Sequence, residues 1–134
     1  MRLVDTSAWI EYLRRTGSPA HLEVRRLLHD EPGTVALTEP VIMELLSGPT
    51  EPRVVAQLEL LVDGLPLLQV DADLDYRAAA AVYRAARLRG RTVRSLLDCL
   101  IAVVAARTGT VLVHRDRDFD VLAECLPDLR VHPL

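Results

Sequence analysis

The chain has 134 residues and a formal net charge of −3, and half of its residues are hydrophobic. This length fits one domain, residues 1–134, that is large enough to bury a core. No apolar run reaches the roughly 18 residues of a membrane span, and the first apolar residues, Leu3 and Val4, lead directly into Asp5 rather than into a secretion signal. We therefore expect a cytoplasmic protein with no membrane partner.

The two cysteines indicate a reduced protein. Cys99 and Cys125 both lie in apolar stretches and suggest no disulfide framework. They could join His114 and His132 in a zinc site, but no ligand spacing supports one. Cysteines buried in the core are the favoured interpretation.

The positive charge is unevenly distributed. All sixteen basic residues are arginines, and five of them fall within residues 84–94 with no acid among them. A solvated helix end explains this run about as well as a phosphate-binding patch does. The phosphate-binding interpretation is favoured only if the run lies beside reactive groups.

Strand-like and helix-like patterns alternate along the chain, with Thr38 and Ser95 as expected helix N-caps and Gly109 as a helix stop. In chain order we expect a strand at 1–5, helices at 6–15 and 18–30, a strand at 34–38, helices at 39–48 and 53–62, a short apolar segment at 66–70, helices at 74–89 and 95–109, a strand at 110–114, a helix at 118–126 and a strand at 129–134.

The strands are short and apolar with little polar alternation, which predicts an α/β fold with a parallel sheet covered by helices on both faces. In such sheets the functional site lies beyond the carboxyl ends of the strands. Asp5 follows the first strand, and His114, Asp116 and Asp118 end or follow the strand "TVLVH". These side chains are therefore expected at the reactive edge.

Each acid also has a structural interpretation. Asp5 could cap the helix that follows it, Asp98 could complete a capping box with Ser95, and either Asp116 or Asp118 could cap the helix containing Phe119. Capping does not explain a further acid in "VIMELL", Glu44, because it borders the apolar face of its helix.

The cost of burial favours a shared site for these acids. An unpaired buried carboxylate costs several kcal/mol, and neighbouring like charges raise the cost. If Asp5, Glu44, Asp98 and Asp116 converge, they must be protonated, pair with arginines or bind a cation. Hard divalent ions prefer oxygen ligands and can activate water at a phosphodiester. The pattern is that of a metal-dependent nuclease.

Four stretches, "MRLVDTSAWIEYL", "EPVIMELLSG", "RTVRSLLDCLIAVVAARTG" and "VLVHRDRDFDVL", resemble the PIN-domain ribonucleases, and specifically the VapC toxins of bacterial toxin–antitoxin pairs. The resemblance spans nearly the whole chain and implies a PIN-like three-layer fold. It implies that Asp5, Glu44, Asp98 and Asp116 form the acidic quartet that binds Mg²⁺ or Mn²⁺. Asp118 matches a further acid, in a second shell or at a second metal site. Thr6 or Ser7 matches the hydroxyl residue beside the first acid.

The same resemblance implies partners. VapC toxins cleave RNA, frequently tRNA or ribosomal RNA, and thereby inhibit translation and growth. They form homodimers and are restrained by a VapB-type antitoxin that inserts a segment near the acidic cleft. Arg91 and Arg94 precede Asp98 and could hold the RNA backbone. Arg115 and Arg117 flank Asp116 and could either clamp phosphates or offset the acids.

Other classes fit less well. A haloacid-dehalogenase-type phosphatase needs a second aspartate two residues after the first, where this chain has Ser7. A receiver domain needs a lysine, and a dinucleotide-binding fold needs glycines after the first strand. A PIN-like module that only binds RNA or protein is the non-enzymatic alternative, and the intact acidic quartet argues against it.

Overall fold

The computed structural model describes residues 1–134 and confirms every expected helix and strand. The order is β1 (Arg2–Val4), α1 (Thr6–Leu13), α2 (Pro19–Asp30), β2 (Val35–Ala36), α3 (Glu39–Ser47), α4 (Pro52–Asp63), α5 (Asp75–Leu88), α6 (Leu96–Thr108), β3 (Val111–His114), α7 (Asp118–Cys125) and β4 (Arg130–Pro133). None of the helices has the length and apolar character needed to cross a membrane.

The four strands form one parallel sheet in the order β2-β1-β3-β4. Within it Val4 of β1 lies opposite Val113 of β3. The apolar segment after α4 also extends the pairing, because Leu67 forms a parallel bridge with Leu37 just beyond β2. All strand ends therefore point to one edge of the sheet, as the sequence predicts.

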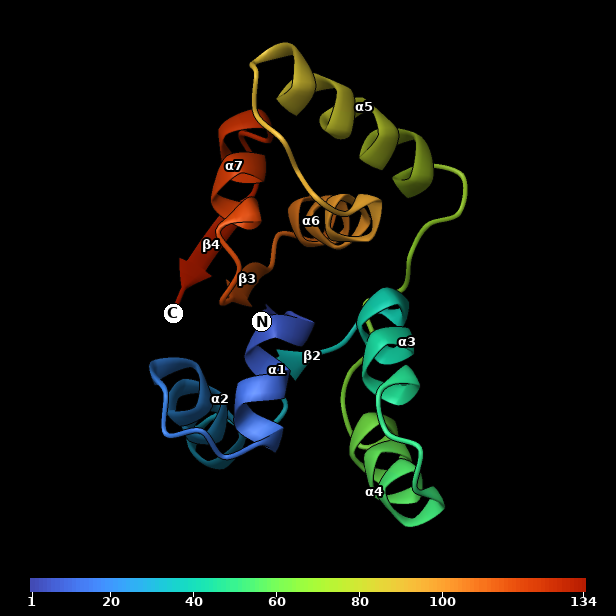
Figure 1. Ribbon diagram of the computed structural model, residues 1–134, viewed down its shortest axis with the longest axis vertical. Helices are drawn as coiled ribbons and strands as arrows, with labels where there is room; N and C mark the ends of the chain where they lie inside the picture. The colour runs from blue at the N-terminus through green and yellow to red at the C-terminus, as the bar shows by residue number, and fades with distance from the viewer.

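The sheet lies between two groups of helices, so that the molecule has three layers (Figure 1). Helices α1 and α2 lie on one side of the strands, α5, α6 and α7 lie on the other, and α3 with α4 extends alongside α1. Residues 99–105 of α6 are all buried. An apolar helix of this kind is suited to the centre of a fold, and its first turn is held at the edge where the strands end.

Two helix ends differ from the sequence-based expectation. Helix α1 ends at Leu13 instead of residue 15, because Arg15 has a left-handed φ of 52° that cannot continue a right-handed helix. Thr38 occupies the N-cap position of α3, but its hydroxyl does not cap the helix and instead donates to the Glu39 carboxylate at 3.3 Å. Ser95 and Gly109 do delimit α6 as expected.

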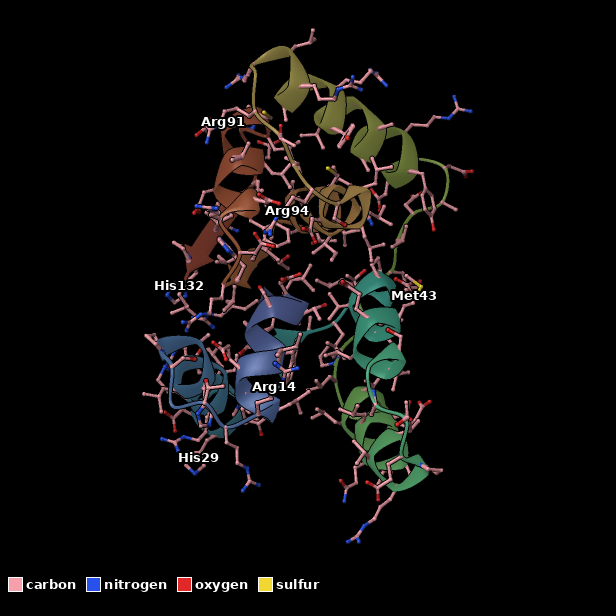
Figure 2. All side chains as sticks on the ribbon, viewed as in Figure 1. Arg14, His29, Met43, Arg91, Arg94 and His132 are labelled. Carbon is pink, nitrogen blue, oxygen red and sulfur yellow. The ribbon has the colours of Figure 1, made fainter.

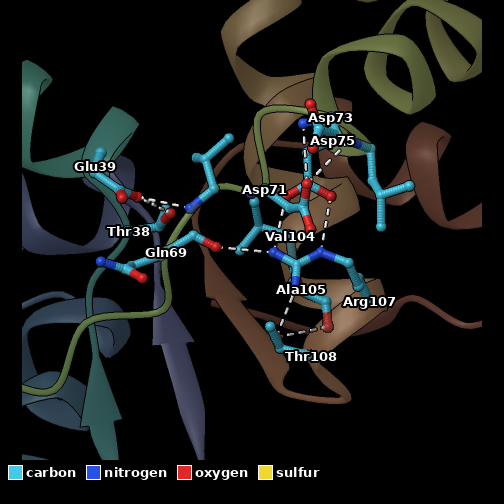
Figure 3. A network of polar contacts seen from close by, with 12 residues as sticks. Thr38, Glu39, Gln69, Asp71, Asp73, Asp75, Val104, Ala105, Arg107 and Thr108 are labelled. Carbon is cyan, nitrogen blue, oxygen red and sulfur yellow. Dashed lines mark hydrogen bonds and ion pairs between the residues drawn. The ribbon is translucent and has the colours of Figure 1, made fainter.

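An ion pair between a buried aspartate and a partly exposed arginine joins α5 to α6 (Figure 3). Arg107 donates from Nε to Asp75 Oδ1 at 2.9 Å and from Nη2 to Asp75 Oδ2 at 2.8 Å, and it also donates to the carbonyl oxygen of Gln69. Burial raises the pKa of Asp75, but the bonds from Arg107 and from the Asp71 amide together bring it below its ordinary value. This pair holds α6 in a fixed orientation against α5.

Candidate active site

Asp5 is positioned by the sheet and by helix α1 together. Its backbone N–H donates to Val113 at 2.9 Å, which continues the strand pairing past the end of β1. Its Oδ2 accepts from the amide of Ser7 at 2.9 Å and from the Ser7 hydroxyl at 2.6 Å, so it does cap α1. Capping uses only Oδ2. The other carboxylate oxygen, Oδ1, is buried without a hydrogen-bond partner.

All four acids of the expected quartet line one cavity of about 280 Å³ at this edge of the sheet. They come from the β1–α1 junction, from α3, from α6 and from the loop after β3. No hydrophobic residue lines the cavity, whose residues are Asp5, Thr6, Ser7, Glu44, Arg94, Ser95, Asp98 and Asp116. Segments distant in sequence thus deliver carboxylates to a single polar space.

The two hydroxyl residues after Asp5 orient the acids. Thr6 donates from Oγ1 to Glu44 Oε1 at 2.8 Å, which ties α3 to the start of α1. The Ser7 hydroxyl donates to Asp5 and accepts from the backbone N–H of Arg115 at 2.9 Å. Ser7 therefore links the first acid to the loop that carries Asp116.

Asp98 is not explained by capping. The Ser95 hydroxyl accepts from the amides of Leu97 and Asp98, at 3.1 and 3.4 Å, but the Asp98 carboxylate makes no hydrogen bond back to Ser95. Half of the expected capping box is present, and the carboxylate instead lines the cavity. Burial, followed by the charges of Asp5 and the other nearby acids, raises the pKa of Asp98 to about 7.

The electrostatics of the cavity favour a bound cation. Burial also raises the pKa of Asp5, with a further contribution from Glu44, while hydrogen bonds from Ser7 act in the opposite direction. Converging carboxylates with raised pKa values and an unpaired buried oxygen are a fitting donor set for a hard divalent ion. The residues present therefore fit Mg²⁺ or Mn²⁺.

A second grouping of acids overlaps this cavity. Carboxylate oxygens of Asp98, Asp116 and Asp118 lie within 4.8 Å of one another, which is close enough to hold a metal ion. Asp118 does not line the cavity, however, and its Oδ2 accepts from the amide and from Nε of Arg94, at 3.2 and 3.0 Å. Arg94 also bonds one oxygen of Asp116, so the cavity lining, which includes Asp116 and not Asp118, is what distinguishes the two acids.

The sequence matches the PIN domain family over residues 2–124. The chain belongs to the PIN-domain family. It is 58% identical over 123 residues to ribonuclease VapC11 of Mycobacterium tuberculosis, an alignment that covers 92% of each chain. These matches place the chain among the VapC proteins of the family.

Solved structures show the same fold. The VapBC2 structure from Rickettsia felis, bound to a DNA fragment from its promoter, matches with a TM-score of 0.74 and 15% identity, covering 99% of this chain and 98% of that chain. Mycobacterium tuberculosis VapC20, described as a sarcin-ricin loop cleaving toxin, matches with a TM-score of 0.67 and 24% identity, covering 97% and 99%. These likenesses establish the three-layer PIN architecture.

The arginines of this PIN domain differ in the acids with which they pair. Arg94 lies between α6 and α7 (Figure 2) and donates from Nη2 to Asp116 Oδ1 at 2.9 Å as well as binding Asp118. Arg91 pairs with Glu124 at 3.0 Å. Arg115 pairs with Glu11 at 3.1 Å and so offsets an acid outside the quartet, whereas Arg117 forms no ion pair. The run at 84–94 is therefore not one continuous patch.

Sequence reasoning missed the role of His114. Its side chain is 1% exposed, and its Nδ1 accepts from the backbone N–H of Asp116 at 3.1 Å. Burial lowers the pKa of His114 against the opposing charges of Asp120 and other acids, so the neutral ring that can accept this bond is favoured. A buried polar residue between a strand and an acid was the available signal.

The structure of the loop after β3 shows that one interpretation, Asp118 as the cap of the following helix, is wrong. Asp118 is the first residue of α7 and does not cap it. The oxygen that accepts its amide hydrogen belongs to Asp116, at 3.0 Å. The cysteines, in contrast, are both free, and no cysteine or histidine belongs to a group that could hold a metal.

Proposed function

We propose that this PIN domain, residues 1–134, is a Mg²⁺- or Mn²⁺-dependent endoribonuclease and acts as the toxin of a toxin–antitoxin pair. The observation that carries the proposal is the convergence of Asp5, Glu44, Asp98 and Asp116 on one polar cavity. The names of the similar proteins, VapC ribonucleases, support the same activity.

Each residue has a defined part in the proposal. Asp5, Glu44, Asp98 and Asp116 hold the cation, with Ser7 and Thr6 orienting the first two. Once bound, such an ion lowers the pKa of water and offsets negative charge at a phosphodiester. Asp98 must give up its proton to become a ligand, so cation binding and proton release are coupled. Asp118 acts behind Asp116, by holding Arg94.

A cleavage assay tests the activity. Purified protein should cut RNA with Mg²⁺ or Mn²⁺ and lose that activity in EDTA, and Asp98→Asn should remove most of it. Asp128→Asn is the matched control, because Asp128 is an exposed acid outside the cavity. Equal cleavage in EDTA and in Mg²⁺ would contradict the metal mechanism, and binding of RNA without cleavage would support a binding module instead.

The proposed substrate class is tRNA or ribosomal RNA, whose cleavage would inhibit translation and growth. Sequence-specific RNA recognition depends largely on loops and shape, which the acid cavity alone does not define. Mapping RNA ends in cells after induced expression would identify the substrate. New ends confined to messenger RNA would contradict this part of the proposal.

The proposed protein partner is a VapB-type antitoxin. A largely apolar groove of about 410 Å³ runs beside α1, α3 and α4 and shares Thr6 and Glu44 with the acid cavity. An antitoxin segment in this groove would reach the acids directly, and several similar structures are VapBC assemblies. Introducing a charge, as in Leu58→Asp, should release the antitoxin in a pull-down, whereas the exposed substitution Arg84→Asp should not.

We also propose a homodimer. Large apolar side chains remain exposed on the helices, among them Leu60, Leu74, Tyr76 and Leu88, and apolar surface of this kind favours association. Light scattering on purified protein at several concentrations tests the proposal, and a monomer throughout the range would contradict it.

A further inference from the structure

A second polar cavity lies where α1 ends and α2 begins. It has a volume of about 440 Å³ and is lined by Tyr12, Leu13, Arg15, His21 and Arg25. Figure 1 shows α1 and α2 side by side at this position, and Figure 2 places Arg14 at the same end of α1. No acid lines the cavity, which distinguishes it from the acid cavity at the other end of α1.

His21 supplies a hydrogen-bond donor to this cavity. Its side chain belongs to the buried part of α2, and its Nδ1 accepts from the backbone N–H of Gly17 at 2.9 Å. The ring hydrogen of a neutral His21 is therefore on Nε2. No protein group accepts a hydrogen bond from Nε2, and His21, at 9% exposed, lines the cavity. A ring donor that is open to the cavity and has no protein acceptor is free to bind a ligand that accepts hydrogen bonds.

The two arginines are available for such a ligand. Arg15 and Arg25 form no ion pair, whereas the nearby Arg26 is bonded to Glu23 and to Glu31. Arg15 also has a φ of 52°, a left-handed conformation that residues other than glycine adopt infrequently. Its side chain is thus presented at the cavity by a turn that the sequence does not favour.

We propose that this cavity binds a backbone phosphate of the RNA substrate. The inference rests on the proposed ribonuclease function. The cavity offers guanidinium, imidazole and phenol donors and no carboxylate, and guanidinium groups match phosphate oxygens in pairs. The phosphate oxygens would accept from Nε2 of His21 and from Arg15 and Arg25.

The position suits a strand that also reaches the acids. Helix α1 has eight residues and is therefore about 12 Å long, on the order of three to four nucleotides at about 3.4 Å each. Leu13 lines both this cavity and the apolar groove, and Thr6 and Glu44 line both the groove and the acid cavity. Neighbouring hollows thus share lining residues along α1. A positive site at the other end of α1 would add to the attraction of the strand that the cation and Arg94 provide at the acids.

A charge-matched pair of double variants tests the site. Arg15→Ala with Arg25→Ala should weaken RNA binding, measured in EDTA so that no cleavage occurs, by about tenfold or more at low salt. Each lost phosphate contact should lower the log–log salt slope by about 0.7 to 0.9. Arg84→Ala with Arg87→Ala removes the same charge from α5 and should have a much smaller effect. Equal losses in both double variants would overturn the proposal, because they would indicate unspecific attraction.

The His21 ring gives a second measurement that is independent of cleavage. In protein with ¹⁵N-labelled histidine, addition of inorganic phosphate should shift the Nε2 signal of His21, and the Arg15→Ala, Arg25→Ala protein should show no such shift. This result can be obtained even if the protein cleaves no RNA, so failure of the ribonuclease proposal is distinguishable. A His21 signal that responds to neither phosphate nor RNA would overturn the site. Loss of antitoxin binding with unchanged RNA binding would assign the cavity to an acidic protein segment instead and overturn the RNA proposal.

Discussion

The Asp98 carboxyl group should make the stability of the protein depend on pH. Its pKa of about 7 in the folded protein lies above the ordinary value of 3.8. Its favourable contribution to the free energy of unfolding is therefore complete below about pH 3.8 and is lost as the pH rises through about 7. Because asparagine cannot ionise, Asp98→Asn removes this loss.

We predict that Asp98→Asn stabilises the metal-free protein at pH 8 and has little effect near pH 4. One pKa unit corresponds to about 1.4 kcal/mol, and after solvent screening at this partly exposed position we expect a gain of about 1–2 kcal/mol. Thermal unfolding in EDTA from pH 4 to pH 8 measures it, with Asp128→Asn as the control. A destabilised Asp98→Asn protein at pH 8 would restore the capping interpretation.

Asp116 and Asp118 should respond differently to substitution. Asp116 lines the acid cavity, whereas Asp118 is engaged by the amide and the side chain of Arg94. We predict that Asp116→Ala abolishes cleavage, while Asp118→Ala leaves residual activity and costs about 1 kcal/mol through the lost bond to the Arg94 amide. Asp118→Asn should retain that bond and most of the stability. Full loss of activity in Asp118→Asn together with residual activity in Asp116→Ala would reverse the two roles.

One buried acid adds an ion pair to the apolar packing of α5 against α6. Asp75 is 1% exposed and is bonded to Arg107 through both of its oxygens. Removal of one partner of a buried pair is costly because it leaves a charge unpaired. We predict that Arg107→Ala destabilises the protein by about 2–3 kcal/mol at pH 7, less than the roughly 3–5 kcal/mol usual for a fully buried pair, because Arg107 itself is partly exposed.

The pH dependence of this variant has the opposite sign to that of Asp98→Asn. The pKa of Asp75 is lowered in the folded protein, so its contribution is present above the unfolded value and is lost as the pH falls through the folded one. The cost of Arg107→Ala should therefore shrink below about pH 4. Chemical denaturation at several pH values checks this, with the exposed Arg84→Ala on α5 as the control. A cost independent of pH would indicate lost packing rather than lost charge pairing.

The order of the elements was predictable because each strand is a short apolar run and each helix has periodic apolar residues. The edge that carries Asp5 and Asp116 followed from parallel pairing alone. The partners of Arg94 and His114 were not predictable, because they depend on how α6 and the loop after β3 meet across the sheet. Local periodicity in the sequence does not define the distance between α6 and this loop. The cavity that Arg15 and Arg25 line was missed for the same reason, since Arg15 lies in the turn after α1 and Arg25 lies on α2.

A cation bound by the quartet should strengthen the contacts between the four segments that supply its ligands. Its ligands would come from the β1–α1 junction, α3, α6 and the loop after β3. A ligand that binds only the folded protein stabilises it by about 2.7 kcal/mol at one hundred times its dissociation constant. We predict that Mn²⁺ raises the melting temperature of the wild type and slows amide exchange in all four segments together.

Hydrogen exchange with mass detection separates this outcome from a local one. Protection should appear around Asp5, Glu44, Asp98 and Asp116, whereas the middle of α5, which contributes no ligand, should be unchanged. In Glu44→Gln the protection of α3 should fall most, because its link to the other ligands is weakened. Protection limited to the loop after β3 and the start of α6 would show that Asp98, Asp116 and Asp118 hold the ion without Asp5 and Glu44. That pattern would contradict the quartet.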